Sequence, residues 1–270
     1  MNLLSFFAFT VFAASAIISP LPDNTPIATP IPAKPEISFG QITSVLGETI
    51  KVTPVPTTQP SPPATAGKSY TIAFLGDSMI DTMGPGLPAI QSDLTNLYPS
   101  TRFTLLNYGV GATNIDYGIE RITSDYIYLG NHIPSLASTH PDIVVLESFA
   151  YNPFPNENGV DRHWLALAHA VDTIHATIPG AKIIIAATIA PHISDLISAD
   201  HKNVIQSYLE STVAFAKGQH LPLADAYHAS LDANGDGIIS YINSGDHIHY
   251  SDSGRALFAK IVVNALQSVL

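Results

Sequence analysis

The chain of 270 residues contains no cysteine. Disulfide bonds, thiolate metal sites and cysteine nucleophiles are therefore excluded, and the fold must be held by its core alone. Basic residues are also scarce, since 11 Lys and Arg stand against 22 Asp and Glu, a formal net charge of −11. These few basic residues are scattered along the chain. We therefore expect no nucleic acid partner.

An apolar run without charge covers the 16 residues from Leu3 to Ile18, and no Lys or Arg precedes it. It includes Ala14-Ser15-Ala16, a small-x-small pattern that an export peptidase could cut. We interpret residues 1–16 as a signal peptide, with an uncleaved N-terminal anchor as the alternative. The run is shorter than the ~20 residues that a spanning helix needs. Either interpretation predicts a secreted or extracytoplasmic protein.

Residues 17–68 are rich in proline and threonine, with eleven prolines between Pro20 and Pro63. Such a composition is typical of an extended linker that packs poorly. A less proline-rich patch at residues 36–52 could form a short pair of strands. The linker would tether a domain at residues 69–270 to a membrane or cell wall.

From residue 69 onward, apolar strands alternate with segments that have apolar residues at helical spacing. The strands are continuously apolar, which indicates burial on both faces and hence a mostly parallel sheet of five strands between two layers of helices. In such α/β folds, sites lie beyond the carboxyl ends of the strands. Strands are predicted at 70–75, 102–108, 142–149, 181–189 and 222–227, and helices at 87–99, 118–130, 162–178, 203–218 and 254–270.

The predicted strand ends bring a serine, a histidine and an aspartate to one edge of the sheet. Ser78 follows the first strand, and Asp246 and His249 precede the last helix. A serine hydroxyl is a weak nucleophile unless a base takes its proton, and His249 can be that base. A carboxylate three residues earlier can orient the imidazole. These three residue types, brought to one edge of the sheet, predict a serine hydrolase.

A hydrolase of this kind also needs donors for the oxyanion that forms on the attacked carbonyl. The candidates are the N–H groups of Ser78 and Gly111 and the amide side chain of Asn152. Glycine suits this role because only hydrogen blocks the approach to its backbone. Gly109 lies in the same loop and is an alternative to Gly111.

Three sequence blocks resemble those of the SGNH (GDSL-like) hydrolase family. "GDS" at 76–78 resembles the nucleophile block, "NYGVGAT" at 107–113 the glycine block, and "DHIHYSDSGRAL" at 246–257 the Asp-x-x-His block. The third family block, Gly-x-Asn-Asp, reads here as "SFAYNP", with Ala150 in place of the glycine and Pro153 in place of the acid. The resemblance covers residues 69–270.

The resemblance implies a flavodoxin-like three-layer α/β/α fold and a set of roles. It implies that Ser78 is the nucleophile, that Gly111 and Asn152 are the oxyanion donors, and that Asp246 and His249 are the acid and base. The expected function is an exported serine esterase, acting without a cofactor on short-chain or O-acetyl esters of small molecules or polysaccharides. The alternatives are a surface-tethered carbohydrate-binding module on a degenerate hydrolase scaffold, and a lipase or acyltransferase of the same family. We expect a monomer.

A second motif follows the fifth predicted strand and resembles the first part of a calcium loop. Its oxygen ligands would be Asp232, Asn234, Asp236 and Ser240, and the twelfth position is Asn243 rather than the usual glutamate. A structural calcium ion is one interpretation of this motif, and an ordinary polar surface loop is the other.

A second Asp-x-x-His pair, Asp172 and His175, lies in the middle of a predicted helix. We interpret this pair as part of a solvated helix face, since it lies away from the strand ends.

Overall fold

The computed structural model describes residues 67–155 and 158–270. The predicted signal peptide, the linker to residue 66 and the strand pair at 36–52 lie outside the described residues. Within the described ranges, no helix has both the length and the apolar character needed to cross a lipid bilayer.

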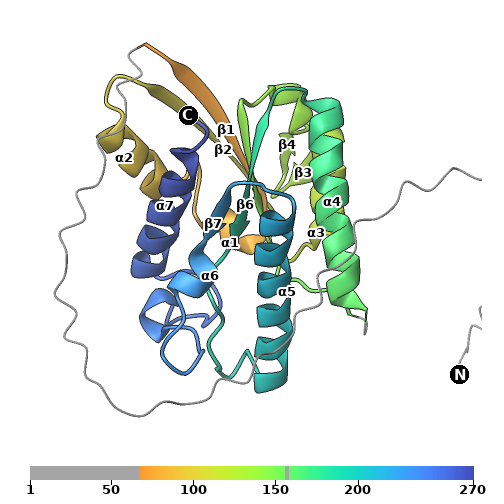
Figure 1. Cartoon of the computed structure of the whole chain (residues 1–270), viewed down its shortest axis with the longest axis vertical. Coiled ribbons are helices and arrows are strands. Elements are labelled where there is room, and N and C mark those ends of the chain that lie inside the picture. Colours follow the sequence, from red (N-terminus) through yellow and green to blue (C-terminus); the bar gives the residue numbers. More distant parts are fainter. Residues whose placement is uncertain (1–66, 156–157) are drawn as a thin grey trace, which may run out of the picture. The chain divides into compact units, whose positions relative to one another are not determined.

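Five parallel strands form the central sheet, in the order β2-β1-β5-β6-β7. Figure 1 shows α2 and α7 over one face of this sheet and α3, α4 and α5 over the other. The prediction of a three-layer α/β/α fold is confirmed. The strands are β1 (Ser69–Gly76), β2 (Arg102–Gly109), β5 (Ile143–Glu147), β6 (Lys182–Ala187) and β7 (Leu223–Asp225).

The helices around the sheet include two very short ones that begin directly at strand ends. The α-helices are α1 (Ser78–Asp81), α2 (Pro88–Leu97), α3 (Ile115–Thr123), α4 (Gly159–Thr177), α5 (Ala199–Gly218), α6 (Ala226–Ala229) and α7 (Asp252–Leu266). Two 3-10 turns, η1 (Ala137–Thr139) and η2 (Ile239–Tyr241), lie in the connections.

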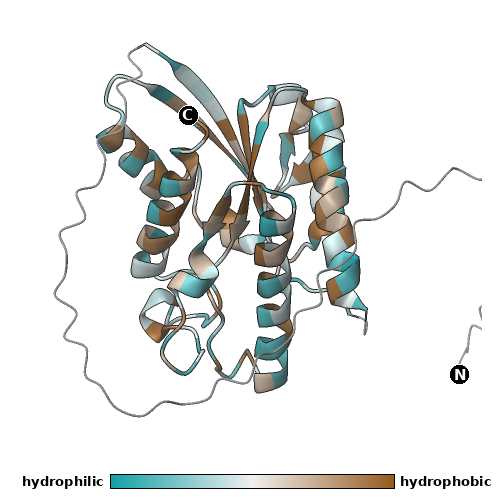
Figure 2. Ribbon diagram, viewed as in Figure 1, coloured by the Kyte–Doolittle hydropathy of each residue, from teal (hydrophilic) through white to brown (hydrophobic). Residues whose placement is uncertain are grey.

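The strands form the core because their residues are apolar on both faces. All five residues of β5 and the last five of β6 are buried. Figure 2 shows the brown, apolar strands enclosed by helices whose outer faces are teal. Apolar helix faces cover both sides of such a sheet, so burial of the continuous apolar strands holds the layers together.

The prediction of a helix over 118–130 is wrong in its second half. Helix α3 ends at Thr123, and a two-stranded hairpin follows, β3 (Tyr126–Tyr128) and β4 (Asn131–Ile133). Its two-residue turn, Leu129-Gly130, has positive φ at both positions, the geometry that joins twisted antiparallel strands. The aromatic and β-branched residues of β3 also favour a strand over a helix.

The sheet order reverses between β1 and β5, which are neighbours in the sheet although β2, the β3–β4 hairpin and several helices lie between them in the chain. At such a switch point the loops after the two strands leave in opposite directions and open a crevice. The loops after β1 and β5 carry Ser78 and Asn152, so the topology itself places two of the predicted site residues at this crevice.

We expect Gly118→Ala in α3 to destabilise the protein by about 1–3 kcal/mol, the usual range for overpacking. Alanine is the better helix former, but a Cβ at this position would lie 2.5 Å from Cζ of the buried Phe149 ring. Chemical denaturation would measure the loss. Gly218→Ala at the end of α5 is the control, because its Cβ would make an ordinary 3.8 Å contact with Trp164. Equal stability of both variants would contradict the prediction.

Candidate active site

Ser78 is the first residue of α1, directly after the end of β1. The turn is tight, because a Cβ on Gly76 would lie 2.3 Å from Cγ1 of Ile80 and 2.9 Å from Cβ of Glu147. The Asp77 side chain caps the helix by accepting a hydrogen bond from Met79 N–H at 2.8 Å. Ser78 itself is only partly buried. The turn therefore presents the serine, with its backbone N–H, at the edge of the sheet.

Asp246 and His249 form a hydrogen-bonded pair in the loop before α7. Nδ1 of His249 lies 2.9 Å from Oδ2 of Asp246. The other carboxylate oxygen accepts the N–H groups of Ile248 and His249, both at 2.9 Å. Burial acts to raise the pKa of Asp246, but these hydrogen bonds and the His249 ring hold that pKa below its ordinary value. The ionised carboxylate thus orients the imidazole and leaves Nε2 for a proton.

The charge of His249 acts to lower the pKa of the buried carboxyl group of Asp77, the residue next to Ser78. A second pair with the same spacing, Asp225 and His228, also has a 2.9 Å contact, but His228 is exposed and turns towards Glu210 at 3.5 Å. Two hydrogen-bonded pairs therefore share this spacing, and the predicted pair differs in that its histidine acts on the residue next to Ser78.

Asp172 and His175, predicted to lie on a solvated helix face, are both exposed on α4. That prediction is confirmed.

The two glycines of the second block differ in what surrounds them. A Cβ on Gly109 would lie 2.1 Å from the backbone nitrogen of Asp81, so this glycine allows β2 and α1 to pack closely. A Cβ on Gly111 would instead lie 3.8 Å from Cβ of Ser78, the predicted nucleophile. This difference favours Gly111 over Gly109 for the predicted role of oxyanion donor.

The Gly111 N–H already has an acceptor, which sequence reasoning missed. It donates at 3.2 Å to the hydroxyl of Tyr128, and that hydroxyl donates at 2.6 Å to the carboxylate of Asp81. Tyr128 belongs to the β3–β4 hairpin, in a segment that the sequence pattern assigned to a helix. The hairpin thus places a polar group beside the nucleophile.

Asn152 lies at the crevice, where its side chain is hydrogen-bonded to the turn that carries Ser78. Its Nδ2 atom donates to Oδ2 of Asp77 at 2.8 Å. The amide nitrogen carries two hydrogens, so one remains for another acceptor. Asp77 is fully buried, and burial raises its pKa, although the bonds from Met79 and Asn152 act in the opposite direction. Asp77 therefore acts as a structural acceptor.

Two further buried ionisable residues lie next to the site, and no sequence pattern had indicated either of them. Glu147 at the end of β5 accepts Phe149 N–H at 2.9 Å and Asp77 N–H at 3.4 Å. Burial, together with the neighbouring Asp77 carboxylate, raises the pKa of Glu147 well above its ordinary value. Arg121 of α3 is only 1% exposed and donates to the carbonyl oxygen of Gly76 at 3.0 Å.

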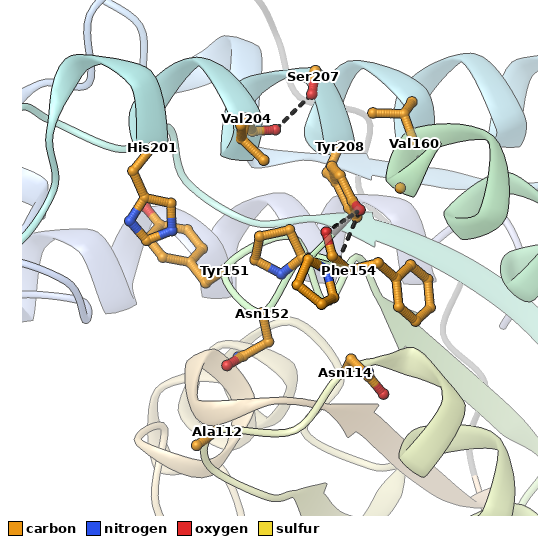
Figure 3. A pocket seen from close by; sticks show the side chains of 13 residues that line it. Ala112, Asn114, Tyr151, Asn152, Phe154, Val160, His201, Val204, Ser207 and Tyr208 are labelled. Carbon is orange, nitrogen blue, oxygen red and sulfur yellow. Dashed lines mark hydrogen bonds between the residues drawn. The ribbon is translucent and has the colours of Figure 1, made fainter. Parts of the chain in front are cut away.

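A groove of about 910 Å³ opens beside Asn152. Figure 3 shows Asn152, Asn114 and Ala112 on one side of it and His201, Val204 and Ser207 of α5 on the other. Prolines and aromatic side chains form much of the remaining wall. The described residues that line the groove include no Asp, Glu, Lys or Arg. The described part of its wall thus consists of apolar, aromatic and neutral polar residues together with His201.

The loop that resembles a calcium site is held by hydrogen bonds and an ion pair. The Asp232 carboxylate accepts the N–H groups of Asn234 at 2.8 Å and Asp236 at 2.9 Å. The Asp236 carboxylate binds the ammonium group of Lys202 at 3.1 Å. Among the described residues, no group of three or more His, Asp or Glu side chains could hold a metal ion. Calcium binding stays a prediction, and an ion here would compete with Lys202.

Comparison with solved structures identifies the fold. The chain is similar to a lipase/acylhydrolase from Enterococcus faecalis, with 16% identity, a TM-score of 0.57 and coverage of 74% of this chain and 97% of that one. It is also similar to a GDSL-like lipase from Bacteroides thetaiotaomicron, with 14% identity, a TM-score of 0.55 and coverage of 74% and 89%. An acetylxylan esterase from Geobacillus stearothermophilus matches with 14% identity, a TM-score of 0.51 and coverage of 74% and 94%.

No protein-family model and no curated protein sequence matches the chain. The likeness to solved structures, at these low identities, establishes the SGNH (GDSL-like) hydrolase fold.

We expect Lys202→Met to increase the dependence of stability on calcium, because it removes the cation that competes for Asp236. The melting temperature should rise between EDTA and several millimolar calcium, and the rise should be larger in the variant than in the unmodified protein. Asp232→Ala combined with Asp236→Ala should abolish it. If neither protein responds, the segment is an ordinary loop held by Lys202.

Proposed function

We propose that the protein is an exported serine esterase. The observation that carries the proposal is the hydrogen-bonded Asp246–His249 pair, whose histidine acts electrostatically on Asp77, the residue next to Ser78 at the switch point of the sheet. Ser78 Oγ attacks the ester carbonyl while Nε2 of His249 takes its proton. The alcohol leaves with that proton, and His249 then activates the water that hydrolyses the acyl group from Ser78.

The negative charge that develops on the carbonyl oxygen is stabilised by three donors. They are the N–H of Ser78, at the start of α1, the N–H of Gly111 and the remaining Nδ2 hydrogen of Asn152. Because Asp77 already fixes the Asn152 amide, this donor needs little reorganisation during the reaction. The proposed roles therefore use residues that three different strand ends bring together.

The substrate we propose is a short-chain or O-acetyl ester of an uncharged polysaccharide. The groove beside Asn152 supports this proposal, because its volume of about 910 Å³ is far larger than an acetyl group needs and its described lining carries no Asp, Glu, Lys or Arg. The groove would bind the sugar units that carry the ester. The acetylxylan esterase with the same fold is consistent with this substrate class. Export is proposed from the apolar N-terminal run.

A binding module on a degenerate hydrolase scaffold is the second candidate. It is favoured by the Tyr128 hydroxyl, which accepts the hydrogen bond of the Gly111 N–H that an esterase would offer to the substrate oxygen. A fluorophosphonate probe distinguishes the two functions, because only an activated serine reacts with it. Labelling at Ser78 supports the esterase, and absence of labelling supports the binding module.

We expect Ser78→Ala and His249→Ala each to lower turnover of a nitrophenyl acetate by roughly four to six orders of magnitude, because the members of a triad act as one unit. The double variant should lose little more. His228→Ala is the matched control, since His228 has the same spacing and the same 2.9 Å contact to an aspartate. Loss of activity in the control, with His249→Ala active, would contradict the assignment of the base.

We expect Tyr128→Phe to react faster with the fluorophosphonate probe, by roughly two- to tenfold. The substitution removes the hydroxyl that accepts the Gly111 N–H, and a hydrogen bond of this kind is worth about 0.5–1.5 kcal/mol net. The rate of labelling in a time course would be compared with that of Tyr126→Phe, on the same strand. Slower labelling in Tyr128→Phe would instead mean that the hydroxyl contributes to binding.

A further inference from the structure

Arg121 is a fully buried arginine with few hydrogen bonds. It is 1% exposed, and its Nε and Nη1 atoms have no hydrogen-bond partner among the described residues. Its guanidinium carbon lies 5.2, 5.7 and 6.0 Å from the ring centres of Tyr117, Tyr126 and Phe149. Ring faces attract a cation, but a buried charge with one hydrogen bond is still costly. Some other interaction must offset that cost.

Among the described residues, the one hydrogen bond of the Arg121 guanidinium ends at the turn that carries Ser78. Its Nη2 atom donates at 3.0 Å to the carbonyl oxygen of Gly76, which also accepts the N–H of Val110 at 3.2 Å. Gly76 immediately precedes Asp77, and Val110 immediately precedes Gly111. A single carbonyl group therefore connects the guanidinium to the two segments that carry backbone oxyanion donors.

The charge of Arg121 also acts on the carboxyl group that holds Asn152. Burial raises the pKa of Asp77, whereas the charges of His249 and Arg121 act to lower it. The titratable groups that act electrostatically on Asp77 from neighbouring elements are Glu147, Arg121, His249, Tyr151 and Tyr250. Among these groups, Arg121 and His249 lower the pKa of Asp77 and so favour its ionised form.

We propose that Arg121 is a positioning residue for the oxyanion hole. Its guanidinium fixes the Gly76 carbonyl and supplies the positive charge that allows the buried Asp77 carboxylate to hold the Asn152 amide. Arg121 does not contact the substrate; it acts through Gly76 and Asp77. This inference rests on the proposed function, because the donors it positions are those of the esterase.

The test is Arg121→Met, with kcat and KM measured on a nitrophenyl acetate. Because an oxyanion donor contributes mainly in the transition state, kcat should fall about ten- to a hundredfold while KM stays within about threefold. Arg121→Lys, which keeps the charge, should recover at least part of the loss. Arg102→Met, an exposed arginine at the start of β2, is the control and should match the unmodified protein. A kcat for Arg121→Met equal to that of the unmodified protein would overturn the inference.

A double-mutant cycle with Asn152→Ala shows whether Arg121 acts through the amide. Removing one oxyanion donor should cost about a hundred- to a thousandfold in kcat. In that background, Arg121→Met should lower kcat by clearly less than it does alone, because one of the donors it positions is gone. If the two losses multiply in full, Arg121 acts elsewhere and the proposal is wrong.

A second variant tests the role of Arg121 if Arg121→Met does not fold. If circular dichroism shows that Arg121→Met is unfolded, Asp77→Asn takes its place, since it removes the other charge at nearly the same size. It should lower kcat with KM little changed, and unmodified activity in Asp77→Asn would overturn the proposal. If the unmodified protein neither hydrolyses esters nor labels at Ser78, the proposed function and this inference fail together. Labelling of Ser78 with normal turnover in Arg121→Met overturns the inference alone.

Discussion

The site depends on one buried carboxylate, that of Asp77. One of its oxygens caps α1 through Met79 N–H, and the other accepts the amide of Asn152. The first bond fixes the helix that begins with Ser78, and the second fixes a side chain that comes from the loop after β5. A fully buried carboxylate is costly unless its hydrogen bonds and charges are satisfied. The nearby charges of Arg121 and His249 therefore belong to the same arrangement.

Close contacts at the carboxyl edge of the sheet hold the parts of this arrangement together. Gly76 and Gly109 are places where a Cβ would overlap neighbouring atoms, at 2.3 Å and 2.1 Å. The side chain of Asn107 adds two bonds at 3.0 Å, to the carbonyl oxygens of Ile80 and Gly84. These contacts hold the end of β2 against α1, so that Gly111 lies beside Ser78. Glycine at the ends of β1 and β2 is here a packing requirement, whereas a Cβ on Gly111 would make only ordinary contacts of 3.5 Å or more.

The fold could be predicted from the sequence because its strands are continuously apolar and its helices have apolar residues at helical spacing. The positions of Ser78, Asp246 and His249 at the carboxyl edge followed from the same pattern. The β3–β4 hairpin could not be predicted, because its strands have three residues each and follow a helical pattern without a break. Tyr128 was missed for that reason.

Arg121 and Glu147 were missed for a different physical reason. Both look like ordinary charged residues of a helix face and a strand end, and only the packing of α3 and β5 against the nucleophile turn buries them. A lone ionisable residue carries no spacing signal, so its burial becomes visible only in three dimensions. The different surroundings of Gly109 and Gly111 likewise depend on contacts with residues far away in the sequence, which no sequence pattern contains.

The third sequence block has Ala150 in place of the glycine of the family pattern, yet the Asn152 side-chain amide still reaches Asp77. Phe149, just before Ala150, adopts a left-handed backbone with φ of 52°, which costs a residue with a Cβ roughly 1–2 kcal/mol. Its fully buried ring lies over Gly118 and 6.0 Å from Arg121, and burial of such a ring is worth about 1.5–3 kcal/mol. Packing therefore offsets the strain. The Phe149 carbonyl then accepts Asn152 N–H at 3.1 Å, a turn that directs the amide to Asp77.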